Sequence, residues 1–199
     1  MDDAQQPWDI PGKEAHPVVN VSWYQSRNYA RWAAMRLLTE AEWEKAASWE
    51  SVNSDQSSGN SGQLSVLRKL ASMVSEQAAG GKKRVYLWGD EFDKNRCNTN
   101  ESGIGTTTPV GQYSPQGDSP YGCADMAGNV WEWTSSLLAS YPYRADDGRE
   151  DQSSSDPRMQ RGGAFGYEAS NARCADRFDS SPDGWSNSGF RCGVGAAEE

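Results

Sequence analysis

Two carboxylates flank a short glycine turn and are the first candidates for metal chemistry. Asp125 precedes Gly128, and Glu132 follows it. On an extended chain, residues 128, 130 and 132 can aim two backbone carbonyls and one side chain at a common point. Calcium takes about 6–8 oxygen ligands and accepts such a mixture of carboxylate and carbonyl oxygens. The segment is therefore compatible with a calcium site, and hydrogen bonding of Glu132 to loop amides is the alternative.

The single histidine and the four cysteines exclude several kinds of active site. A zinc or iron site with several histidines cannot be built from His16 alone. A Ser-His-Asp hydrolase would have to use His16, which precedes Pro17 in an expected loop. The cysteines contain no CxxC pair, which argues against zinc ribbons and thioredoxin-type sites. Buried free thiols and one or two disulfides both remain open.

The charge balance also limits the partners. A net charge of −9 argues against a phosphate-backbone binder or a basic membrane-surface module. No apolar run approaches the roughly 20 residues that a bilayer crossing needs, and the first residues lack a signal-peptide profile. We therefore expect no nucleic-acid partner, no membrane insertion and, by default, a cytoplasmic location. Surface display through a segment outside this chain is left open.

The candidate residues need a scaffold, and 199 residues suffice for one domain. Ser22 is a good N-cap for a helix that runs to about Met35, and Thr39 and Glu42 form a capping box for a second helix. Short strands are expected at residues 108–112, 130–134, 160–164 and 189–194. The polar composition of residues 48–83 predicts a flexible insertion. Nine tryptophans and 20 glycines indicate an irregular, loop-rich fold with aromatic anchors.

Six segments share an order and spacing that composition does not explain. They are residues 16–23, 36–47, 88–90 (Trp88-Gly-Asp90), 122–134, 161–163 (Arg161-Gly-Gly163) and 189–192 (Gly189-Phe-Arg-Cys192). Together they resemble the formylglycine-generating enzyme (sulfatase-modifying factor) family. The resemblance implies an α+β, C-type-lectin-like fold with two helices, small twisted antiparallel sheets and extensive loops. We expect one such domain over residues 1–199.

The same resemblance implies two metal sites. Calcium would be held by the side chains of Asp125 and Glu132 and by the backbone of Gly128 and Val130. An additional site would use Asn98, the Thr99 carbonyl, Ser102 and Ile104, although Ser102 stands where the family has a carboxylate.

One departure from the family bears on catalysis. The oxidase members carry two reactive cysteines shortly after the Gly-Gly pair, where copper and the substrate cysteine meet. Residues 164–173 contain no cysteine, and Cys174 and Cys192 match later cysteines of the family that are structural. Without a thiolate pair there is neither a ligand set for Cu(I) nor a nucleophile. The sequence therefore predicts that the chain is not an enzyme and binds no copper.

Residues 164–188 carry a narrower resemblance, to the variable proteins of diversity-generating retroelements. Their C-terminal segment is rewritten at adenine-bearing codons, so that one scaffold displays different side chains. Here aromatic and small polar residues replace the Asn and Arg that other family members usually carry. Tyr and Trp give rigid contact area, while Ser, Gly and Asn adapt hydrogen bonds. The predicted ligand-binding residues are Ala164, Phe165, Gly166, Tyr167, Asp176, Phe178, Ser180, Ser181, Gly184, Trp185 and Ser186.

These resemblances predict a non-catalytic binding protein. It would present a (hyper)variable C-terminal surface to an unknown macromolecular ligand, which we expect to be a protein. A non-diversifying scaffold member of the family and a formylglycine-generating-type oxidase are the alternatives. Arg161, Arg173 and Arg191 are expected to donate hydrogen bonds to loop carbonyls rather than to form a ligand cradle. Trp131 and Trp133 are expected to be core anchors.

Overall fold

Two helices, six strands and two short 3-10 helices make up the described part of the chain. The computed structural model describes residues 11–49, 83–144, 146–184 and 187–195. Nearly all of the predicted insertion at residues 48–83 lies outside them. The elements are α1 (Trp23–Trp32), β1 (Arg36–Leu37), α2 (Glu40–Ser48), η3 (Asn100–Ser102), β2 (Trp131–Leu137), β3 (Arg158–Arg161), η4 (Ala169–Ala172), β4 (Phe178–Ser180), β5 (Ser188–Phe190) and β6 (Cys192–Gly193).

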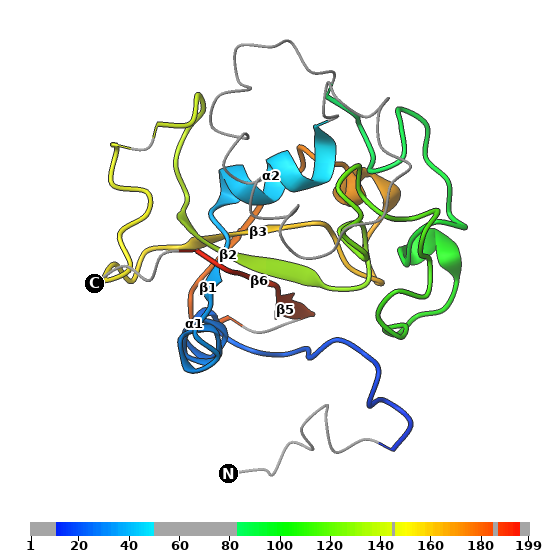
Figure 1. Ribbon diagram of the computed structural model, residues 1–199, viewed down its shortest axis with the longest axis horizontal. Coiled ribbons are helices and arrows are strands. Elements are labelled where there is room, and N and C mark those ends of the chain that lie inside the picture. The colour runs from blue at the N-terminus through cyan, green and yellow to red at the C-terminus, as the bar shows by residue number, and fades with distance from the viewer. Residues whose placement is uncertain (1–10, 50–82, 145, 185–186, 196–199) are drawn as a thin grey trace, which may run out of the picture.

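Four of the strands form the central sheet, in the order β4-β3-β2-β5. β3 pairs antiparallel with both β2 and β4, whereas β5 runs parallel to β2. β1 and β6 form a second, antiparallel pair. Figure 1 shows α1 and α2 on opposite sides of these strands. The predicted α+β, C-type-lectin-like architecture is confirmed, with the parallel β2–β5 pair as the difference from purely antiparallel sheets.

Both helices begin at the predicted caps. The Ser22 hydroxyl accepts a hydrogen bond from the Gln25 amide, and Thr39 and Glu42 form the expected reciprocal capping box. α1 ends at Trp32 rather than near Met35, and Ala34 then has a left-handed φ of 54°, in which an α-helix cannot continue. No helix in the described ranges is long and apolar enough to cross a membrane.

The core lies in two clusters, one beside each helix. Trp133 packs with Trp23 of α1, while Trp43 of α2 packs with Met126 and other buried residues. Trp131 and Trp133 are 0% and 1% exposed, so the prediction that both are buried anchors is confirmed. The Trp133 indole N–H also donates to the Val21 carbonyl at 2.8 Å, which satisfies a buried polar group.

One strand prediction is wrong. Residues 108–112 enter a turn instead of a strand. Pro109 has no amide hydrogen to donate to a sheet, and Gly111 adopts a left-handed φ of 78°. The strands expected at residues 130–134, 160–164 and 189–194 correspond to β2, to β3, and to β5 with β6, with shifted ends.

Candidate ligand-binding face

Two glycines shape the loop that carries the first predicted binding residues. Gly162 and Gly163 follow β3 with φ of 97° and 76°. A Cβ on Gly162 would lie 3.2 Å from the Trp43 ring, and one on Gly163 would lie 3.0 Å from the Asn171 backbone. Left-handed φ and close approach together make glycine the residue that fits both positions.

Beyond this turn, three aromatic side chains from separate parts of the chain meet. We call Trp131, Tyr167 and Phe178 the aromatic platform. The rings of Trp131 and Phe178 are stacked, with centroids 5.1 Å apart, and Tyr167 meets Trp131 edge-on at 5.4 Å. Trp131 is fully buried, whereas Phe178 is 41% exposed, and Tyr167 is half-buried. Trp131 thus forms a floor that supports two partly exposed rings.

Backbone contacts hold the two upper rings in place. The Tyr167 amide donates to the Ala164 carbonyl at 2.9 Å, and its own carbonyl accepts from the Asn100 amide at 2.8 Å. Phe178 lies on β4, an edge strand of the central sheet, opposite Gln160 of β3. Both rings are therefore positioned by main-chain interactions as well as by Trp131.

The other predicted binding residues fall into four groups. Ala164 is fully buried, so the structure offers no surface of this residue for contact with a ligand. The Asp176 carboxylate accepts from Asn171 at 3.1 Å and lies 3.5 Å from Arg173. Trp185 and Ser186 lie outside the described residues. The remaining ones are exposed or half-buried: Phe165, Gly166, Ser180, Ser181 and Gly184.

The predicted calcium ligand Glu132 has side-chain partners of its own. Its two carboxylate oxygens accept from Nε and Nη2 of Arg191, each at 2.6 Å, and one of them also accepts from Trp43 Nε1 at 2.6 Å. Burial alone would lower the pKa of Arg191, but the adjacent Glu132 outweighs it and raises that pKa. A carboxylate offers about four acceptor positions, so three are in use.

The remaining predicted ligands do not complete a metal site around Glu132. Asp125 accepts from the Gly111 amide at 2.6 Å, and burial raises the pKa of Asp125. The Gly128 carbonyl accepts from the Val130 amide at 2.9 Å. No group of three or more His, Cys, Asp or Glu side chains able to hold a metal occurs within the described ranges. In this arrangement the donors do not fit calcium, so no functional step is assigned to it, and the calcium site stays a prediction.

The residues of the additional predicted site are hydrogen-bonded to one another. The Ser102 hydroxyl donates to Asn98 Oδ1 at 2.9 Å and accepts from the Ile104 amide at 3.3 Å. Asn98 Nδ2 donates to the Thr106 carbonyl at 2.8 Å, and Thr99 is buried. Calcium at this turn likewise stays a prediction.

All four cysteines are free thiols, so the structure favours that alternative over disulfides. Burial raises the pKa of Cys97 and of Cys174 to about 12. Both thiols are therefore protonated near neutral pH, and neither belongs to the aromatic platform.

The three arginines considered from the sequence each donate to a backbone carbonyl, as predicted, although the carbonyl that Arg173 contacts lies in η4 rather than in a loop. Arg161 donates to Asp176, Arg173 to Ser170 at 2.8 Å, and Arg191 to Ala124 at 2.9 Å.

Sequence reasoning missed two features. It placed Trp131 in the core alone and did not anticipate that Tyr167 and Phe178 cover it, because no local pattern links residues so far apart in the chain. It also missed a cavity beside α1. Arg27 and Arg31 lie one turn apart on that helix, and this like-charged spacing was the available signal.

The folded architecture and the motifs along it define a C-type-lectin-like domain of the formylglycine-generating-enzyme type. Residues 2–195 match the Sulfatase-modifying factor enzyme 1-like domain. The chain therefore belongs to this family, as the sequence motifs indicated.

Several known proteins are similar to this chain over most of its length. It is 39% identical to the formylglycine-generating enzyme of Streptomyces coelicolor over 191 residues, which cover 92% of this chain and 54% of that protein. It is 34% identical to the inactive C-alpha-formylglycine-generating enzyme 2 of Bos taurus, over 94% of this chain and 53% of that protein. The chain thus spans about half the length of these curated relatives.

A solved structure supports the fold. Treponema denticola variable protein 1 superposes with a TM-score of 0.55 over 91% of this chain and 72% of that one, at 21% identity. At this level of identity the likeness establishes the fold alone.

The comparisons contradict the prediction that the chain is not an enzyme. That prediction rested on the absence of cysteine from residues 164–173. The 39% identity to a formylglycine-generating enzyme, over 92% of the chain, instead points to an enzyme family. The absence of one local motif is weaker evidence about class than similarity along the whole domain.

Proposed function

We propose that this domain binds a protein ligand through the aromatic platform and the small polar residues around it. The observation that carries the proposal is the stacking of the 41% exposed Phe178 on the fully buried Trp131. A large ring at the surface, held by a rigid floor, loses little conformational entropy when it is covered by a partner.

The surroundings of the platform suit this role. Ser180 follows Phe178 on β4, and Ser181 is exposed just beyond the strand. Hydroxyl groups beside an aromatic anchor can adapt their hydrogen bonds to different partners. Aromatic anchors of this kind often act as binding hot spots, where truncation costs about 2 kcal/mol or more of binding free energy.

A finer proposal is that the displayed side chains vary among copies of the gene, as in the variable proteins of diversity-generating retroelements. The composition of residues 164–188 and the likeness in fold to a variable protein support it. Sequencing the genomic neighbourhood tests it directly. We expect a nearby reverse transcriptase gene and a second copy of the segment that encodes residues 164–192, differing mainly at adenines. A neighbourhood without either would refute this finer proposal and leave ligand binding to its own test.

Affinity capture tests ligand binding. The wild-type domain, Phe178→Ala and Tyr167→Ala are immobilised and exposed to lysate from the organism that encodes the chain. Trp32→Ala is the matched control, because Trp32 is 80% exposed on α1 and lies outside the platform. We expect proteins that the wild type and the control retain and that both platform variants lose. Retention that is the same for all four proteins would refute the proposed binding face.

Catalysis of the family's type is a second candidate, favoured by the 39% identity to a formylglycine-generating enzyme. Its test is conversion of the cysteine in a sulfatase-motif peptide to an aldehyde in the presence of copper, followed by mass spectrometry. Copper-dependent aldehyde formation would support this candidate, whereas the absence of product at matched protein concentrations would oppose it.

A further inference from the structure

A cavity of about 400 Å³ lies between α1, β1, the start of α2 and the loop after β2. Small-molecule sites typically have volumes of about 300–1,000 Å³. Its lining includes Ser135, which is four residues beyond Trp131 on β2 and hence roughly 13 Å along the strand from the aromatic platform. The cavity is therefore a separate candidate site, and it does not depend on the function proposed above.

One wall of the cavity carries two arginines of α1. Arg27 and Arg31 project from successive turns of α1, and neither forms an ion pair with another described residue. Arg27 donates one hydrogen bond, to the Gln152 carbonyl at 3.0 Å, while its buried Nε has no partner within the described ranges. Burial, followed by the charge of Arg31, lowers the pKa of Arg27. A bound anion would favour the charged guanidinium and so offset both effects.

The Arg27 guanidinium is also held in a fixed place. It lies over the Trp23 ring, 4.8 Å from the ring centroid, and Trp23 is fully buried. A planar guanidinium stacked on an aromatic ring is ordered before a ligand arrives. In contrast, Arg36 in the same cavity is neutralised by Glu42, with two contacts of 2.6 and 2.7 Å.

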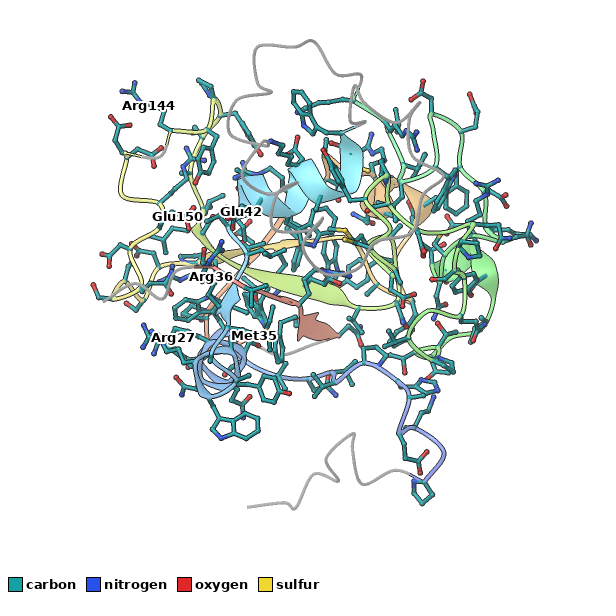
Figure 2. The ribbon with its side chains drawn as sticks, viewed as in Figure 1. Arg27, Met35, Arg36, Glu42, Arg144 and Glu150 are labelled. Atoms are coloured by element: carbon teal, nitrogen blue, oxygen red, sulfur yellow. The ribbon has the colours of Figure 1, made fainter. Side chains whose placement is uncertain are left out.

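A carboxylate lies elsewhere on the cavity lining. Glu150 accepts hydrogen bonds from the hydroxyls of Ser135 at 2.7 Å, Ser136, and Tyr143 at 3.1 Å, and it forms no ion pair with a described residue. Burial, followed by the charge of Glu150, raises the pKa of Tyr143 to about 12. Figure 2 shows Arg27 on the α1 side and Glu150 away from it, with Arg36 between them and Glu42 beside Glu150 in this view.

We propose that this cavity binds a small amino acid whose carboxylate contacts Arg27 and Arg31 and whose ammonium group contacts Glu150. The apolar lining from Met35 and Leu37 would contact the methylene groups between the two charged ends. Inorganic phosphate and other dianions are disfavoured, because Glu150 repels a second negative charge. An uncharged end is disfavoured as well, since it gives Glu150 no opposite charge.

Calorimetric titration of the full chain tests the proposal, with glycine, β-alanine, 4-aminobutyrate and 6-aminohexanoate as probes. Butyrate, butylamine and inorganic phosphate are the matched single-feature controls. We expect saturable binding of at least one amino acid and weaker binding of each control. The preferred chain length then measures the separation of the two charged ends.

Two arginine variants locate the binding. Arg31→Gln is expected to weaken the preferred amino acid about tenfold, as for the loss of one charge-assisted contact. Arg144→Gln removes the same charge from a side chain that is 68% exposed and lies outside the cavity lining, so it should leave binding unchanged. Both replacements are at exposed positions, which keeps misfolding from obscuring the result.

Each contrary outcome overturns a defined part of the proposal. No saturable binding of any amino acid at millimolar concentration would refute the site. Equal weakening by Arg31→Gln and Arg144→Gln would show that net charge alone is responsible. If butyrate binds as tightly as 4-aminobutyrate, the role of Glu150 is refuted. If phosphate binds more tightly than every other probe, the ligand is an inorganic anion and the proposal of an amino acid is refuted.

Discussion

Replacement of Phe178 by alanine tests whether the aromatic platform belongs to the surface or to the core. Phe178 is 41% exposed, so a little under three fifths of it is buried. Full burial of a Phe side chain contributes about 1.5–3 kcal/mol, and this fraction corresponds to about 1–2 kcal/mol of unfolding free energy. Its stacking on Trp131 at 5.1 Å moves the expected loss toward the upper end of that range.

Trp131→Ala provides the contrast within the same cluster. Trp131 is 0% exposed, and removal of a fully buried large aromatic side chain costs about 3–5 kcal/mol. Urea unfolding followed by far-UV circular dichroism measures both variants. This signal is preferable to fluorescence, because Trp131 is one of nine tryptophans whose emission would change with the substitution itself. The slope of the unfolding free energy against urea concentration should be the same in both variants as in the wild type.

A loss of about 3 kcal/mol or more in Phe178→Ala would refute the reasoning, because such a loss is typical of core aromatic residues. The platform would then be a structural cluster, and the case for a displayed binding surface would fall. A loss of less than about 1 kcal/mol of unfolding free energy in Trp131→Ala would also refute the reasoning, since Trp131 would then not be packed as the structure describes.

Three further predictions concern the ion pairs and the thiols. Burial would raise the pKa of Glu44, but the hydrogen bond from Lys83 and the charge of Arg161 outweigh it and lower that pKa. Its ionised form therefore stabilises the fold above pH of about 4.3, and this stability is lost as the pH falls through the lower folded-state pKa. The melting temperature should accordingly fall less steeply with decreasing pH in Glu44→Gln than in the wild type. An unchanged slope would contradict this role of Glu44. Cys97 and Cys174, with pKa raised by burial to about 12, should resist iodoacetamide in the folded chain. The half-buried Cys123 should react before them when followed by mass spectrometry, and the reverse order would contradict the described burial. Glu132→Gln should lower the free energy of unfolding by about 3 kcal/mol, because Arg191 is left largely buried without its counter-charge. If Glu132 is a calcium ligand, calcium added after chelation should raise the melting temperature of the wild type, and a rise that persists in Glu132→Gln would place the ion elsewhere.

The local parts of this fold could be predicted from the sequence. The cap at Thr39 and Glu42 is complete within four residues, so nothing distant is needed to form it. The alternation of Trp131, Glu132 and Trp133 likewise fixes which side chains share a face once the segment is a strand. These elements follow from short-range geometry, and the structure reproduces them.

The candidate site could be predicted only in part, because it depends on distant contacts. Glu132 is bonded to Arg191, which approaches it only through the parallel pairing of β2 with β5. The sequence offered calcium ligands or loop amides for this carboxylate and gave no sign of the arginine. Tyr167 and Phe178 were placed on a common face, but Trp131 as their shared floor could not be read from spacing alone.

The way the platform loop is held explains how its side chains can differ without loss of the fold. The Tyr167 main chain makes the hydrogen bonds to Ala164 and Asn100. Arg161 donates a hydrogen bond to the carbonyl of Asp176 rather than to its carboxylate. The turn before them depends on Gly162 and Gly163, which lie outside the predicted binding set. A substitution of the Tyr167 or Phe178 side chain therefore leaves these backbone restraints intact. The same argument predicts less freedom at Asp176, whose carboxylate bonds to Asn171, and least at Ala164, which has no exposed surface.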